Sequence, residues 1–172
     1  HLRFGRIAKE VYMDDYRYQA LRTLTRARFD VIQNLTREKQ RFANYLFLKC
    51  SGIAQDKDIQ NTSATTIALM ERFETVDDLA NADLEELTSF IDEKGRNFAD
   101  PAAKARAIQT AARDSYRLPI TVNNSVNQAM AVSIASMRAL ERQVKVLDKA
   151  IEHQFEIIPN TLISIPGIGK VY

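Results

Sequence analysis

The side chains best suited to chemistry in this sequence are arginines that recur on one side of a predicted helix. The set consists of Arg22, Arg26, Arg37 and Arg41. At about 100° per residue they fall within an arc of roughly 100°, because steps of three and four residues both come close to a full turn. Polyanions could meet such an arc through their phosphates. A solvated basic face is the alternative interpretation.

A second candidate lies near the C-terminus, where IPGIG spans residues 165–169. Gly167 and Gly169 permit close approach of the backbone, and exposed amides at a helix start attract anions. A short helix ending at Ser164 and a second beginning at Lys170 would resemble the first half of a helix-hairpin-helix. The predicted phosphate contacts here are Ile165, Gly167, Ile168, Gly169 and Lys170. A plain glycine-containing turn is the alternative, because half of that motif is absent.

Several acidic residues invite a metal-site interpretation, namely Asp14, Asp15, Asp77, Asp78, Glu85 and Glu86. Acids at helix starts and on a solvated face account for them, and no histidine lies nearby to complete a transition-metal set. His153 stands alone in the sequence, as surface or packing histidines commonly do. No Ser/His/Asp set and no nucleotide-binding glycine loop occurs either. We therefore predict no catalytic residue, metal ligand or cofactor site within this chain.

The arginine arc must be positioned by a long helix predicted over residues 16–49. A seam of eight residues alternates by three and four along it, and six of the eight are apolar: Leu21, Leu24, Arg28, Val31, Leu35, Glu38, Phe42 and Tyr45. A second long helix is predicted from about Asn124 to Glu156, with the seam Val126, Met130, Ser133, Met137, Leu140, Val144, Leu147 and Ile151. Such seams pair in coiled coils, within one chain or between two copies.

Between the long helices, residues 65–118 are predicted to form a tip of short helices. Thr65 or Thr66, Thr75 with Asp78, Asp83, and Asp100 before Pro101 are the start signals, and Gly95 is a stop signal. Ser51 and Gly52 are predicted to end the first long helix, and the polar stretch IAQDKDIQNTSATT (53–66) is predicted to be a loop. The predicted fold is all-α, with two long antiparallel helices, a small bundle at their far end and the start of a helix-hairpin-helix. Its parts are a connector (1–14), a coiled-coil domain (15–158) and the beginning of another domain (159–172).

The composition agrees with a folded protein, since 45% of the 172 residues are apolar and 27% are charged. The lone Cys50 excludes an internal disulfide and favours a reducing cytoplasm. No apolar run approaches the ~18 residues that a membrane helix needs, so no membrane partner is expected. The net charge of +2 is uneven. Residues 15–49 contain eight basic and three acidic residues, whereas residues 74–94 contain one basic and eight acidic residues.

Three stretches resemble one protein family. They are LRFGRIAKE (2–10), LRTLTRARFDVIQNLTREKQRFANYLFLK (21–49) and LISIPGIGKV (162–171). They are similar to insertion-sequence transposases with a RuvC-like N-terminal domain, which carries four acidic residues, and a C-terminal domain with a catalytic serine. Some members are guided by a bridge RNA. The spacing of LR, LTR and LTRE in the second stretch is the most specific part of the resemblance.

The resemblance implies that this chain is the helical middle of such a transposase. The acidic residues would precede the LRFGR-like segment and the serine would follow IPGIG, so both would lie outside residues 1–172. The chain begins at His1 and ends within an expected helix start, so we expect a piece of a longer bacterial cytoplasmic protein. That parent would use Mg²⁺ and would bind DNA and a guide RNA, with contacts at residues 165–169 and the arginine arc. A coiled-coil scaffold that self-associates without nucleic-acid contact is the alternative.

Overall fold

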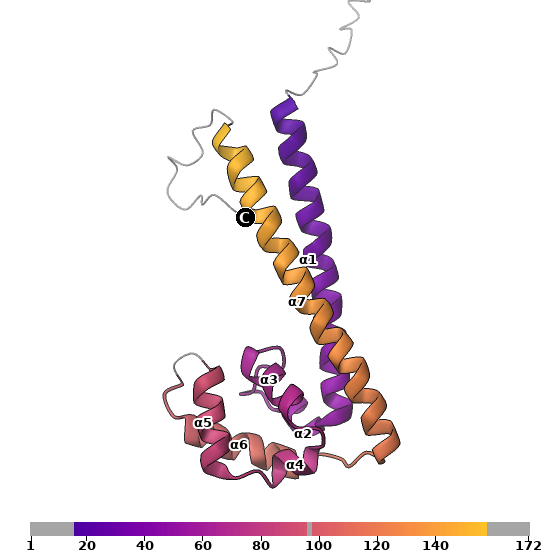
Figure 1. Ribbon diagram of the computed structural model, residues 1–172, viewed down its shortest axis with the longest axis vertical. Helices are drawn as coiled ribbons and strands as arrows, with labels where there is room; N and C mark the ends of the chain where they lie inside the picture. The colour runs from indigo at the N-terminus through magenta and orange to yellow at the C-terminus, as the bar shows by residue number, and fades with distance from the viewer. Residues whose placement is uncertain (1–15, 96–97, 158–172) are drawn as a thin grey trace, which may run out of the picture. The chain divides into compact units, whose positions relative to one another are not determined.

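A computed structural model describes residues 16–95 and 98–157, and all regular structure in these ranges is helical (Figure 1). The helices are α1 (Tyr16–Lys49), α2 (Ser51–Gln55), α3 (Ala64–Arg72), α4 (Val76–Ala80), α5 (Leu84–Lys94), α6 (Pro101–Arg113) and α7 (Ile120–Ile157). The all-α prediction is confirmed. The chain forms two compact units: the terminal unit, up to Asn34 and from Leu140, and the central unit, Leu35–Ala139.

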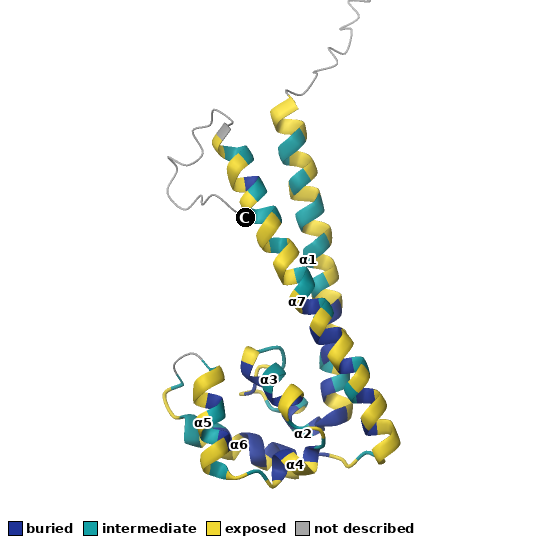
Figure 2. Cartoon of the chain, in the orientation of Figure 1, coloured by how far each residue is buried: buried dark blue, intermediate teal, exposed yellow. Residues whose placement is uncertain are grey.

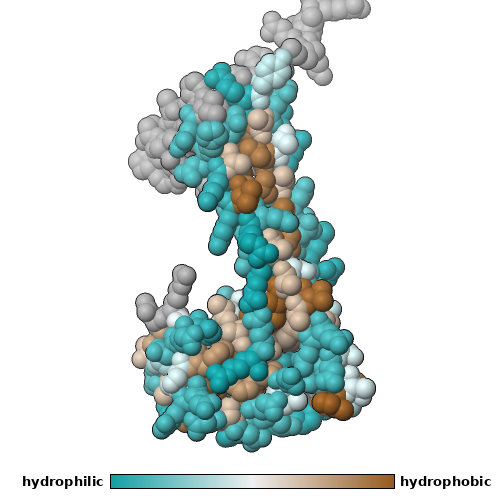
Figure 3. Space-filling view, viewed as in Figure 1, coloured by the Kyte–Doolittle hydropathy of each residue, from teal (hydrophilic) through white to brown (hydrophobic). Residues whose placement is uncertain are grey.

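In the terminal unit, the first part of α1 packs antiparallel to the last part of α7. The predicted seam residues are the ones withdrawn from solvent, with Leu21 and Val31 half-buried and Ile151 buried. Arg28, a polar residue within that seam, donates from Nε to Asp148 Oδ1 on the facing helix. Figure 3 shows apolar residues gathered along the long helices and flanked by hydrophilic ones. The predicted antiparallel pairing of the two long helices is therefore present in this unit, and here it occurs within one chain.

In the central unit, the rest of α1 packs on the first part of α7, and both add to the core of the short helices. Phe42, Met130 and Met137 are buried at predicted seam positions. Figure 2 shows buried residues in dark blue on this part of the long helices and on α6. The Ser133 hydroxyl, also buried there, donates to the backbone carbonyl of Glu38 at 3.5 Å. Burial of several such side chains, each contributing about 1.5–3 kcal/mol, stabilises this end of the helix pair.

The short helices begin where most of the predicted caps lie. Thr75 and Asp78 form a capping box: the Asp78 amide donates to Thr75 Oγ1 (3.1 Å) and the Thr75 amide to Asp78 Oδ2 (2.9 Å). Asp83 accepts from the first-turn amides of α5, which ends at Gly95 as predicted. α6 is the central helix of this group, because α2, α4 and α5 all pack against it.

Four predicted boundaries differ from the structure. Residues 51–55 form α2, where the sequence predicts a helix end at Ser51 and Gly52 and a loop from residue 53; the helix forms because Ser51 and Ile53 are buried there. Ser63, and neither Thr65 nor Thr66, caps α3, since its hydroxyl accepts from the Thr66 amide at 3.1 Å. The other two differences concern α6 and α7. The stretch PAAKARAIQTAARDS predicts a helix over residues 101–115, but α6 ends at Arg113, and α7 begins at Ile120 rather than about Asn124.

The α7 difference has a local cause, since the carbonyl of Pro119 accepts from the amides of Val122 and Asn123. Proline restricts the residue before it and lacks only its own N–H, so it permits a helix to start directly after it. The connector 1–14, the proposed cap at Asp14 and Asp15, and the segment 159–172 with its IPGIG turn lie outside the described residues.

Replacing Asp100 by alanine is expected to lower the free energy of unfolding by about 1 kcal/mol. The Asp100 carboxylate accepts from the Ala103 amide at 2.8 Å, and this amide has no carbonyl partner within the helix. Urea unfolding followed by circular dichroism measures the change. Asp100→Asn, which keeps the acceptor, is expected to unfold like the unsubstituted protein, and an equal loss in both variants would show that the cap is not the cause.

Candidate nucleic-acid interface

The arginine arc divides into two pairs, one in each unit. Within each pair the two arginines lie about one helical turn apart on α1. In the terminal unit, Arg22 and Arg26 are exposed on the side of α1 opposite the seam. The nearby Thr23 and Thr25 hydroxyls donate to carbonyls of their own helix, at 2.9 and 3.0 Å. Arg22 and Arg26 thus present two exposed cationic side chains on this side of the helix, where a polyanion could meet them.

The pair in the central unit combines one exposed arginine with one that has a second role. Arg37 is exposed. Arg41 donates from Nη1 to Glu38 Oε2 at 2.8 Å, and the Glu38 side chain is only 11% exposed. The arginine therefore neutralises a carboxylate at a buried seam position, while two thirds of its own side chain remains in solvent. A buried carboxylate without such a partner would be costly, so Arg41 also has a structural task.

Several acids of the short helices make ion pairs with nearby arginines. Arg117 pairs with Asp77 at 2.7 Å, and Arg138 binds both carboxylate oxygens of Glu71, at 2.7 and 2.8 Å. The guanidinium carbon of Arg72 lies 4.7 Å from the centre of the Phe90 ring, which is a cation–π contact. Among residues 16–95 and 98–157, no group of three or more His, Cys, Asp or Glu side chains is arranged to hold a metal ion.

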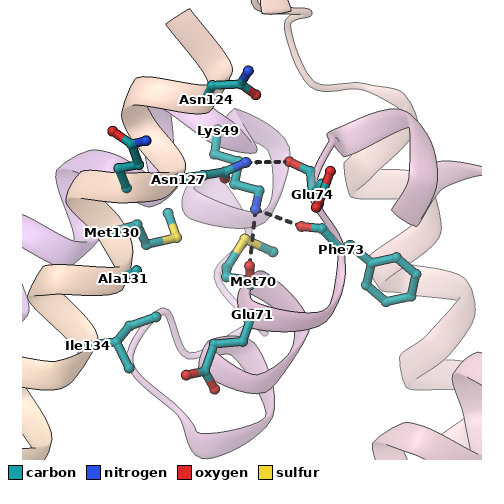
Figure 4. A pocket seen from close by; sticks show the side chains of 11 residues that line it. Lys49, Met70, Glu71, Phe73, Glu74, Asn124, Asn127, Met130, Ala131 and Ile134 are labelled. Carbon is teal, nitrogen blue, oxygen red and sulfur yellow. Dashed lines mark hydrogen bonds between the residues drawn. The ribbon is translucent and has the colours of Figure 1, made fainter.

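A pocket of the central unit that the sequence did not predict lies between α3, α7 and the end of α1. Its volume is about 500 Å³. The Lys49 ammonium donates to the backbone carbonyls of Met70 (3.0 Å) and Phe73 (2.7 Å) (Figure 4). The side-chain amides of Asn123 and Asn127 both donate to the carbonyl of Glu74, at 3.0 and 2.8 Å. These donors satisfy the carbonyls exposed where α3 ends.

The electrostatics of this pocket follow from burial. Loss of solvent lowers the pKa of Lys49 from 10.5 to about 8, while the nearby Cys50 and Glu74 oppose that change. Burial likewise raises the pKa of the Cys50 thiol, against its hydrogen bond with Ser115. One signal for a buried Lys49 was present in the sequence: it follows Tyr45 by four residues and so continues the seam. Its contacts make Lys49 a cap for α3.

The five residues of the predicted C-terminal phosphate site, Ile165, Gly167, Ile168, Gly169 and Lys170, lie outside the described residues. Within the described ranges, none of the helices is long and apolar enough to cross a membrane. The candidate interface therefore consists of the exposed side of α1 in each unit.

No protein-family model, no curated protein and no solved structure matches this chain.

Proposed function

We propose that this chain is the central helical part of a transposase that acts in DNA transposition, and that it contacts nucleic acid through α1. The observation that carries the proposal is the exposure of Arg22, Arg26 and Arg37 on the side of α1 away from its seam. The resemblance of residues 21–49 to the transposase family, whose members act on DNA and in some cases bind a bridge RNA, supports it. The paired long helices would then hold two catalytic domains at a set spacing.

The proposal assigns no chemical step to this chain. In the parent protein, Mg²⁺ would be held by acidic residues of the RuvC-like domain, and the nucleophile would be the serine of the C-terminal domain. Strand cleavage and rejoining would thus belong to residues outside 1–172. The contribution of α1 is electrostatic, since arginines beside phosphates displace condensed counterions.

The chain is expected to bind both duplex DNA and structured RNA, with an affinity that falls steeply as salt rises. Fluorescence anisotropy between about 50 and 300 mM salt measures this dependence. Replacing both Arg22 and Arg26 by alanine is expected to reduce the steepness of the log–log salt dependence by about 1–2, since each lost phosphate contact removes close to one.

A matched control removes two exposed cations from the same unit on the other helix, by replacing Lys145 and Lys149 with alanine. That variant has the same net charge as the double arginine variant but keeps both arginines of α1. Its affinity is therefore expected to depend more steeply on salt than that of the double arginine variant. Equal losses in the two variants would attribute binding to net charge rather than to α1. No binding to either nucleic acid at ~50 mM salt would refute the proposal.

A coiled-coil scaffold that self-associates without nucleic acid is the second candidate. One observation favours it: Val132 in the central unit and Val146 in the terminal unit are exposed on α7. An apolar side chain on an outer helix face can pair with a second copy. Sedimentation at high concentration decides this, because a monomer would exclude self-association through this region, and a dimer that Val146→Asp dissociates would support it.

A further inference from the structure

Two aromatic rings stand in solvent beside the arginines of the terminal unit. Tyr18 is 48% exposed and Phe29 is 60% exposed. Tyr18 precedes Arg22 by four residues, and Phe29 follows Arg26 by three. Residues three or four apart on a helix are surface neighbours, so each aromatic residue is a neighbour of an arginine on the helix surface. We call these four residues the aromatic–arginine face.

The charge around this face is mainly positive. Residues 16–34 contain four arginines and one acid, Asp30. Arg28 is turned to the seam, where it pairs with Asp148. Thr23 and Thr25 hydrogen-bond their own helix, so they do not compete for a ligand on this surface. The face therefore combines positive charge with flat apolar rings.

That combination distinguishes between forms of nucleic acid. In a duplex the bases are stacked on each other, and arginines reach only phosphates and groove edges. In an unpaired strand the bases can stack on aromatic side chains while cations follow the backbone. An exposed ring contributes little to phosphate binding, so the rings of Tyr18 and Phe29 favour the second form.

We infer that the aromatic–arginine face binds an unpaired nucleic-acid strand, with bases stacked on Phe29 and Tyr18 and phosphates beside Arg22 and Arg26. This inference rests on the proposed nucleic-acid function and narrows it from any polyanion to unpaired segments. Loops of a structured RNA and single-stranded DNA share the required chemistry, namely a π-face on each base and one phosphate per nucleotide.

The test compares the affinities of single-stranded RNA, single-stranded DNA and a duplex, each of about 12 nucleotides per strand and mixed sequence, at one salt concentration. Phe29→Ala and Tyr18→Ala are each expected to weaken single-strand binding at least about fivefold, and duplex binding less than about twofold. Tyr116→Ala is the matched control, because Tyr116 is an exposed aromatic of the central unit that lies outside α1. It is expected to change both affinities less than about twofold.

Each outcome separates the inference from the proposal on which it rests. Unchanged single-strand affinity in Phe29→Ala and Tyr18→Ala, with weakened binding to all three probes in Arg26→Ala, would overturn the inference and leave the proposed function standing. Absence of binding to any probe would overturn the proposed function itself. If Phe29→Ala dissociates a dimer without changing affinity, the face is an interface between two copies and the inference fails. Binding of both single strands, or of single-stranded RNA alone, supports the inference. The comparison also shows whether the bound strand is RNA or DNA.

Discussion

Replacing Gly52 by alanine is expected to lower the free energy of unfolding by about 3 kcal/mol, although glycine-to-alanine changes in helices usually stabilise by up to ~1 kcal/mol. A Cβ atom at Gly52 would lie 2.0 Å from the backbone carbonyl oxygen of Ala111 in α6. Backbone cannot rotate away as a side chain can, so α2 would have to move off α6. That movement would strain the hydrogen bonds from the Gly52 amide to Ser115 Oγ and from the Tyr116 amide to Ser51 Oγ.

Gln55→Ala is the control for this prediction, because Gln55 is an exposed residue of the same helix. Its effect is expected to stay within about 0.5 kcal/mol. Chemical denaturation of the three proteins supplies the comparison. A stabilising Gly52→Ala would mean that α2 does not pack against Ala111, and would contradict the described packing of the central unit.

Loss of the proton from the buried Lys49 ammonium is expected to make the protein more stable as pH rises from about 7 to 10. Its pKa is about 8 when folded and 10.5 ordinarily. Between these values the unfolded chain holds more protons than the folded one, so stability increases with pH. The cost of burying the charge is therefore fully present below about pH 8 and disappears above about 10.5. The contribution of Lys49 changes by about 2 kcal/mol over the range from pH 7 to 10.

Cys50 acts in the opposite direction, because its raised pKa makes the unfolded chain lose that proton first as pH rises. Comparison with Lys49→Met isolates the lysine, since both proteins keep Cys50 and methionine fills a similar volume. The measurement is urea unfolding of both proteins at several pH values. The difference in unfolding free energy, unsubstituted minus variant, should rise by ~2 kcal/mol, and a constant difference would show that Lys49 is solvated in the folded state.

The long helices and most caps were predictable because their signals are local. Apolar residues that recur every three or four positions predict a buried helix seam without knowledge of the partner helix. Every predicted seam residue of both helices is buried or half-buried in the structure. Thr75 with Asp78, and Asp100 before Pro101, act on amides within three residues of themselves. Such contacts depend on sequence neighbours alone.

The missed features depend on residues far apart in the chain. α2 exists because Ser51 and Ile53 are buried in the core of the central unit, while its sequence alone resembles a polar loop. Gly52 taken alone predicts a helix stop, but it is required where α2 approaches Ala111, 59 residues later. The partners of Lys49, 21 and 24 residues away, likewise become visible only in three dimensions.

The candidate interface was predictable in part. Helical geometry placed Arg22, Arg26, Arg37 and Arg41 away from the seam, and all four are exposed. The pairing of Arg41 with the buried Glu38 was not foreseen, because an acid in an apolar seam has no defined partner in sequence. Phe29 belongs to the residue types that are usually buried, so its residue type alone does not predict the 60% exposure that the structure shows.

Photo-crosslinking of the chain to a structured RNA that carries 4-thiouridine, followed by mass spectrometry of the peptides, tests the central claim most directly. Because α1 carries the exposed arginines and residues 74–94 carry a strong negative charge, the two segments should react differently. Crosslinks are expected in peptides from Tyr16–Lys49 and none in residues 74–94. Crosslinks confined to residues 74–94, or no RNA-dependent crosslink in α1, would contradict nucleic-acid contact through this helix.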